Sequence, residues 1–146
     1  MPANKTESAA SAQIIVTMNR IMTRHGREMS RQLSPLGINV RSARLLARIH
    51  GAESRRCREL ARACALDAVT LSHALKKLDQ PGFVTRKRIG DDARAIEVRL
   101  TAPGKQLAQR CHDIEHSFES ALLDALPPQA LAHVTKWLAQ IDRAQF

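Results

Sequence analysis

Short polar and basic side chains recur at helical spacing in residues 67–79, a segment that reads DAVTLSHALKKLD. Residues three and four apart share one face of a helix, so these hydroxyl, imidazole and ammonium groups would lie together, opposite the leucines. Such groups hydrogen-bond to base edges and pair with phosphates, which is the chemistry of nucleic-acid recognition. The candidate residues are Thr70, Ser72, His73, Lys76 and Lys77.

A second group of cations follows in two β-like runs, residues 83–88 and 95–100, which predict a hairpin with a charged tip. These cations are Arg86, Lys87, Arg88 and Arg94. Asp92 could hold the Arg94 guanidinium by a charge-assisted hydrogen bond, or it could cap its own turn, and both roles remain open. Arg41 and Ser42 open another predicted helix and could contact a phosphate through its N-terminus.

The net charge of +9 is unevenly distributed along the 146 residues. Residues 41–100 hold fourteen Lys and Arg against seven Asp and Glu, a net charge of +7. Residues 101–146 hold four against five, a net charge of −1. The positive charge coincides with the polar helix and the hairpin, which favours a contact with duplex DNA over a merely solvated surface.

Other reactive side chains form weaker patterns. His112 and His116 are four apart and could chelate a metal with Glu119 or Cys111, but an exposed helix face explains them better. Cys57 and Cys64 are seven residues apart and share one helical face. We expect them to act as small apolar side chains of the core, in preference to sensing redox changes. We find no catalytic set, no metal site and no cofactor motif, and expect no enzyme.

Length and composition agree with one mainly α-helical domain spanning residues 1–146. Hydrophobic residues make up 44% of the chain and aromatic residues 3%, which suits a small helical core. No apolar run approaches the roughly 18 residues that cross a bilayer, so we expect no membrane partner. Three cysteines without chelating spacing suggest a reducing compartment, and we expect a cytoplasmic protein that associates with the nucleoid when bound to DNA.

Turn and cap residues divide the chain into helices around the hairpin. Residues 1–11 are expected to be a frayed arm, and a long helix is expected at 12–33. Asn39, Asp67 and Thr101 are expected to cap the helices that follow them. A short helix at 57–64 should bury Cys57, Leu60, Ala61 and Cys64, and the helix after Asp67 should use Val69, Leu71, Ala74, Leu75 and Leu78 as its apolar positions.

The terminal helices, about 12–33 and 103–146, carry more apolar surface than one small domain can cover. Packing against a second copy is the simplest solution, and we therefore expect a homodimer in preference to a monomeric bundle. A two-fold dimer would present two reading helices to the half-sites of a pseudo-palindromic operator. The lobe that carries them is expected at about residues 39–101.

Several motifs make the chain resemble the MarR family of winged helix-turn-helix transcription regulators. These are Glu59-Leu60-Ala61, Leu66 with Thr70, Leu78, Gly82-Phe83-Val84, Asp92-Ala93-Arg94 and Leu100-Thr101 with Gly104. The resemblance implies a mainly α fold with a small β-hairpin wing, and it covers residues 33 to 110 best. The chain departs from the family pattern at Val69, His73, Ala65 and Arg55-Arg56. The operator sequence that this protein recognises therefore cannot be inferred from the family.

The resemblance also implies roles for single residues. It suggests that Arg94 enters the minor groove, where A·T tracts concentrate negative potential. It suggests that a small effector such as an aromatic acid or phenol binds between the dimer helices and the lobe, with Met18, Met22, His25 and Arg44 as candidate contacts. We therefore expect a repressor that a ligand releases from DNA. Two alternatives stay open: a redox- or metal-responsive regulator without organic effector, and a helical interaction protein that has lost DNA binding.

Overall fold

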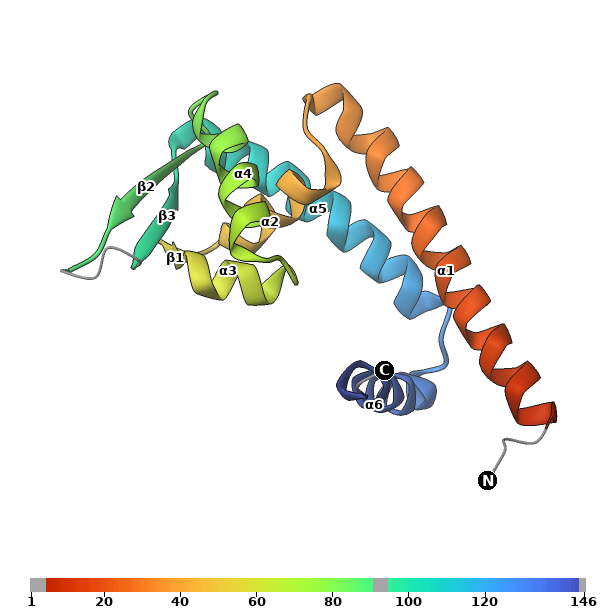
Figure 1. The fold of residues 1–146 in the computed structure, drawn as a ribbon. Coiled ribbons are helices and arrows are strands. Elements are labelled where there is room, and N and C mark those ends of the chain that lie inside the picture. The colour runs from red at the N-terminus through yellow and green to blue at the C-terminus, as the bar shows by residue number, and fades with distance from the viewer. Residues whose placement is uncertain (1–4, 91–94, 145–146) are drawn as a thin grey trace.

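The structure, a computed structural model, describes residues 5–90 and 95–144, with the side chains of residues 5–8 left out. Its fold is the expected mainly helical winged helix-turn-helix (Figure 1). The helices are α1 (Lys5–Leu33), α2 (Val40–Ile49), α3 (Cys57–Ala63), α4 (Ala68–Asp79), α5 (Ala102–Asp124) and α6 (Pro128–Arg143), with a short 3-10 turn, η1 (Ser34–Leu36). The strands are β1 (Arg55–Arg56), β2 (Val84–Arg88) and β3 (Ile96–Leu100).

All three predicted helix caps are confirmed. The side chains of Asn39, Asp67 and Thr101 each accept a hydrogen bond from the backbone N–H three residues later, at 2.9, 2.8 and 3.1 Å. Each cap satisfies one of the amide groups that a helix start leaves without a partner. The starts of α2, α4 and α5 therefore follow from local sequence.

The wing is a three-stranded antiparallel sheet in the order β1-β3-β2, where the sequence predicted only the hairpin of β2 and β3. In the hairpin, Val84 pairs with Leu100 and Arg88 with Ile96. The added strand pairs Arg55 with Val98 and Arg56 with Glu97. Sequence patterns missed β1 because a strand of two residues has no periodicity and its partner lies far along the chain.

The core lies between α2, α4, the start of α5 and the sheet. Leu45, Leu46 and Ile49 of α2 have no exposed surface, and Ala108 and Cys111 of α5 are equally buried. Leu71, Ala74, Leu75 and Leu78 supply the inner face of α4, as their spacing predicted. Among the described side chains of α1, those of Met29 and Leu33 near its C-terminal end join this cluster.

Three expectations about the elements were wrong in detail. Helix α1 begins at Lys5, so residues 5–11 are helical where a frayed arm was expected, and the helix expected at 12–33 starts seven residues earlier. In α3, Leu60 alone is fully buried, while Cys57, Ala61 and Cys64 only pack against the core from its edge. Val69 is 67% exposed, because it lies two residues before Leu71 and hence about 200° around the helix from it.

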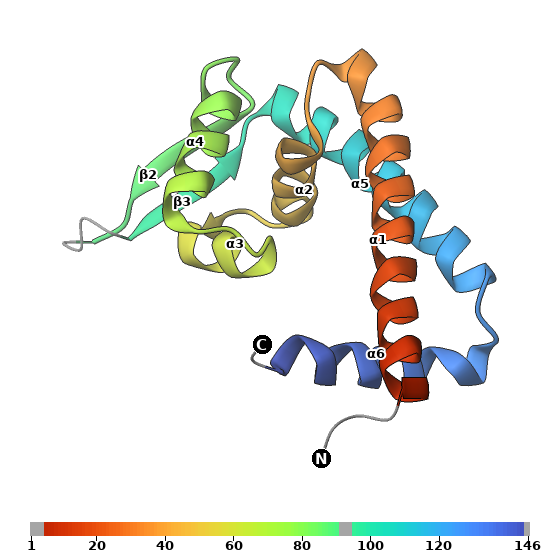
Figure 2. The same ribbon diagram turned by 45° about the vertical axis from the view of Figure 1, so that its right-hand side comes forward.

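Helix α1 extends away from the lobe (Figure 1), and α6 lies below the lobe in the view of Figure 2, where it passes the N-terminal half of α1. An apolar groove of about 770 Å³ lies between them, and α6 has no fully buried residue. Large apolar side chains here stay exposed in the single chain, among them Ile14, Met22, Trp137, Leu138 and Ile141. Within the described residues, no helix is both long and apolar enough to span a bilayer.

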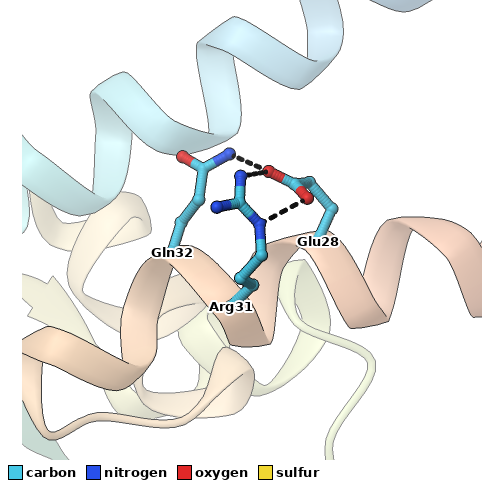
Figure 3. Close-up of polar contacts among 3 residues, drawn as sticks. All are labelled: Glu28, Arg31 and Gln32. Atoms are coloured by element: carbon cyan, nitrogen blue, oxygen red, sulfur yellow. Dashed lines mark hydrogen bonds and ion pairs between the residues drawn. The ribbon is translucent and has the colours of Figure 1, made fainter.

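A small polar cluster near the C-terminal end of α1 lies on its surface (Figure 3). Glu28 accepts hydrogen bonds from Arg31 at 2.6 and 3.0 Å and from Gln32 at 2.6 Å. These bonds lower the pKa of Glu28 to about 2. The cluster ties successive turns of α1 together just before Leu33, where the helix ends.

One tight junction joins the hairpin to α5. The Thr101 backbone N–H donates to the Phe83 carbonyl at 3.1 Å, and the Thr101 hydroxyl donates to the Gly82 carbonyl at 2.6 Å. Gly104 is buried against the same segment, and a Cβ there would lie 1.8 Å from the Phe83 oxygen. The Leu-Thr-x-x-Gly motif therefore reflects a position where only glycine lets two backbone segments meet.

We expect Gly104→Ala to lower the free energy of unfolding by about 2 kcal/mol or more, because the new methyl group overlaps backbone atoms that cannot rotate away. Urea denaturation followed by circular dichroism measures this loss. Gly26→Ala is the matched control, since a Cβ at Gly26 meets no atom within 4 Å, and it should be neutral or stabilising. Equal midpoints for Gly104→Ala and wild type would contradict the close approach.

Candidate nucleic-acid interface

The solvent face of α4 is the central feature of the candidate interface. Ser72, His73, Lys76 and Lys77 are exposed, while the leucines on the opposite face enter the core. Thr70 is half-buried at the edge of this face. The structure therefore gathers the α4 candidates on one accessible surface, as the spacing predicted.

The Asp67 cap determines what Thr70 can do. Asp67 Oδ1 accepts the Thr70 backbone N–H, and Asp67 Oδ2 accepts the Thr70 hydroxyl at 2.7 Å. These bonds lower the pKa of Asp67, so the carboxylate remains charged well below neutral pH. The Thr70 hydroxyl proton is thus already used, which leaves the first turn of α4 rigid and its other side chains free to face a ligand.

Arg86 has a different position from that expected of a free phosphate contact. Its guanidinium donates to Asp79 Oδ2 through Nε at 3.2 Å and Nη2 at 2.9 Å. Asp79 ends α4 and Arg86 lies in β2, so this ion pair joins the recognition helix to the wing. Both side chains are about one third exposed, and the pair therefore fixes orientation more than it adds stability.

The remaining candidates differ in how accessible they are. Arg41, Lys87 and Arg88 are exposed, the last two on β2. Ser42 is only 4% exposed and its N–H is bonded to Asn39, which removes this side chain from the set that can reach a phosphate. Asp92 and Arg94 lie outside the described residues, so their predicted roles stay predictions.

A hollow of about 340 Å³ opens between α1, α2, α3 and α5, and we call it the α2–α5 hollow. It is lined by His25, Arg44, Arg48, Cys64, Glu115 and Phe118, among others. Two of the predicted ligand contacts, His25 and Arg44, thus lie together. Met18 instead lines the groove between α1 and α6, and Met22 is 55% exposed and lines neither site.

Charges of both signs face the α2–α5 hollow. Burial, together with the nearby Arg44, lowers the pKa of His25, so its imidazole is neutral at pH 7. Burial raises the pKa of Glu115, against the opposing effect of Arg48 and Arg44. The His25 ring lies 3.8 Å from that of Phe118, and its Nδ1 is buried without a hydrogen-bond partner among the described residues. Sequence analysis did not identify Arg48 of α2 or Glu115 and Phe118 of α5, because no sequence pattern indicates that this part of α5 packs beside His25 and Arg44.

The three cysteines and the two histidines of α5 have the following surroundings in the structure. Burial raises the pKa of Cys57 and Cys64, and it raises that of Cys111 to about 12, so all three stay protonated at neutral pH. His112 stacks on His50 at 5.1 Å, and His116 is 3.8 Å from Glu119. Across residues 5–90 and 95–144, no three His, Cys, Asp or Glu side chains are arranged to hold a metal ion.

Sequence comparisons match this region to known proteins. The model of the MarR family matches residues 38–96, which hold the helix-turn-helix and most of the wing. The chain is 30% identical over 102 residues to an HTH-type transcriptional repressor of Mycobacterium tuberculosis, covering 68% of this chain and 71% of that protein. It is 33% identical over 94 residues to the organic hydroperoxide resistance transcriptional regulator of Bacillus subtilis, covering 60% of this chain but only 63% of the regulator's length.

Solved structures match over most of the chain. A MarR family regulator from Silicibacter pomeroyi aligns with a TM-score of 0.70 at 28% identity, covering 89% of this chain and 90% of that one. A mutant MarR from E. coli complexed with operator DNA aligns with a TM-score of 0.72 at 22% identity, covering 95% and 99%. NadR in complex with 4-hydroxyphenylacetate aligns with a TM-score of 0.71 at 19% identity, covering 99% and 100%. The last two support the fold alone.

Proposed function

The chain belongs to the MarR family of DNA-binding, non-enzymatic transcription regulators, and from this premise we propose that it is a homodimeric repressor of a pseudo-palindromic operator, released by a small organic acid. The observation that carries the proposal is the exposed face of α4, where Ser72, His73 and Lys76 stand beside a wing whose Lys87 and Arg88 are exposed. The Mycobacterium tuberculosis relative, itself named a repressor, supports the sign of regulation.

In the proposed complex, α4 enters the major groove and the wing lies along the flanking backbone. Ser72 and His73 have donors and acceptors suited to base edges, while Lys76, Lys77, Lys87 and Arg88 pair with phosphates. Arg41 reaches a phosphate from the start of α2, and Arg94 enters the minor groove with Asp92 beside it. Arg86, held by Asp79, sets the angle between α4 and the wing.

The dimer is supported by the apolar surface of the outer helices. Ile14 and Met18 of α1 face Leu138 and Ile141 of α6 across a groove that the single chain leaves open. Exposed apolar patches of this kind mark contact surfaces. In the proposed dimer, the outer helices of a second copy cover them. A two-fold pair then presents two α4 helices to half-sites about one helical turn apart.

The effector is proposed to bind in the α2–α5 hollow. Arg44 and Arg48 suit a carboxylate, Phe118 suits an aromatic ring, and the buried Nδ1 of His25 lacks a partner that a ligand hydroxyl would supply. We choose 4-hydroxyphenylacetate, the compound with which NadR has been crystallised, as the probe of this ligand class. Because the hollow lies between α1 and α5 on one side and α2 and α3 on the other, a ligand that prefers one lobe orientation changes the spacing of the α4 helices.

Binding of the full chain to its selected operator should weaken steeply with salt, with log Kd rising linearly against log salt concentration. We expect Lys76→Ala and Lys77→Ala each to reduce that slope by about 1.8, because each removes one phosphate contact from each of the two subunits of the proposed dimer. Fluorescence anisotropy measures the slope. Lys136→Ala, which removes an exposed lysine from α6, is the control that should leave it unchanged. A flat slope for the wild type would rule out this mode of binding.

Leu138→Glu should convert the dimer to a monomer, raising the dimer dissociation constant at least a hundredfold, because burying unpaired carboxylates in an apolar contact costs several kcal/mol. Sedimentation equilibrium measures the change, and circular dichroism checks that the lobe stays folded. Gln129→Glu adds the same charge at an exposed position of α6 and should remain dimeric. A dimeric Leu138→Glu protein would place the interface elsewhere.

Aromatic carboxylates such as 4-hydroxyphenylacetate should displace the protein from its operator, and Arg44→Ala should require at least tenfold more ligand because the carboxylate loses a charged partner. Operator anisotropy during ligand titration measures this. Arg110→Ala, on α5 outside the hollow, is the control. Peroxide should have little effect, since all three thiols are protonated. Release by peroxide but by no carboxylate would instead favour the redox-responsive alternative.

A further inference from the structure

Val69 is an apolar side chain in an unusual place. It lies in the first turn of α4 and is 67% exposed. All other large hydrophobic side chains found exposed in the described part of the chain belong to α1, α5 or α6, the outer helices. Val69 therefore lies apart from the exposed apolar surface of the outer helices, which the proposed dimer would cover.

The neighbours of Val69 define what it faces. Ser72, His73 and Lys76 lie three, four and seven residues further on, so all four side chains share one stripe of α4. The three polar members are exposed and are the residues proposed to meet the DNA. Val69 is at the N-terminal end of this stripe, and the N-terminal half of a recognition helix is the part that lies deepest in the major groove.

The cap of α4 holds this valine in place. Asp67 and Thr70 are joined by two hydrogen bonds, of 2.8 and 2.7 Å, that close the turn containing Val69. The Thr70 hydroxyl proton is used within that turn. A β-branched side chain in a helix has few rotamers, so Val69 presents two methyl groups in a nearly fixed direction.

We propose that Val69 reads a thymine, by packing against its 5-methyl group in the major groove. The inference rests on the proposed function, because it requires α4 to lie in that groove. The thymine methyl is the apolar group that base edges offer there. Cytosine at the same position would place an amino donor against methyl groups that cannot accept a hydrogen bond, so Val69 also discriminates against the C·G pair.

The test removes only that methyl group. A duplex selected from a random-sequence pool by the wild-type protein is synthesised with deoxyuridine replacing each thymine in turn, and Kd is measured for each. We expect one thymine per half-site at which the replacement weakens wild-type binding about fourfold, the size expected for one buried methyl group. Val69→Ser should be insensitive at that position, and Val69→Ile should remain sensitive.

The salt dependence provides the matched control, because a methyl contact neutralises no phosphate and Val69→Ser should keep the wild-type slope. Selection with Val69→Ser should also lose the thymine preference at that one position. If Val69→Ser shows the same deoxyuridine losses as the wild type, another group reads the methyl and the inference is overturned while DNA binding stands. If the wild type selects no duplex and binds none in dilute salt, the proposed function itself fails.

Discussion

The meeting of Phe83 with Gly104 is the constraint on which the arrangement of the lobe depends. At this junction the end of the turn after α4, the start of β2 and the first turn of α5 come within hydrogen-bond distance, with Thr101 bonded to both Gly82 and Phe83. Glycine at 104 permits the approach. One contact between backbones thereby orients the recognition helix and the wing relative to α5, the helix that leads out of the lobe (Figure 1).

From that junction outward, ion pairs refine the geometry of the DNA-facing surface. The ion pair of Asp79 with Arg86 connects α4 to the wing. Arg99 of β3 forms an ion pair of 3.0 Å with Glu53, which lies just before β1. These pairs are too exposed to stabilise the fold much. Their effect is on the orientation of the wing relative to α4 and to the segment before β1. Arg86, which the sequence analysis proposed as a phosphate contact, is paired with Asp79 in the structure and holds the wing beside α4.

Much of the lobe could be predicted from sequence because its signals are local. Asn39, Asp67 and Thr101 each act on an amide three residues away, and the leucines of α4 repeat at the helical period. Features that depend on contacts between different elements were missed: the pairing of β1 with β3, the ion pair of Arg86 with Asp79 across the turn after α4, and the convergence of Arg48, Glu115 and Phe118 on the α2–α5 hollow. Val69 is a different case. Its spacing from Leu71 places it on the outer face of α4, but the sequence analysis assigned it to the core because its side chain is apolar.

Helix α6 has no fully buried residue in the single chain. This bears on how the protein concentration determines the fraction of operator sites that are occupied. The described core lies within the lobe and the adjoining ends of α1 and α5, and α6 adds no fully buried residue to it. In the proposed dimer, which is built on the outer helices, assembly covers apolar surface that lies outside that core. Below the assembly constant, the concentration of paired subunits grows as the square of the total, and occupancy of a two-fold site responds to expression level more sharply than a single-subunit binder would allow.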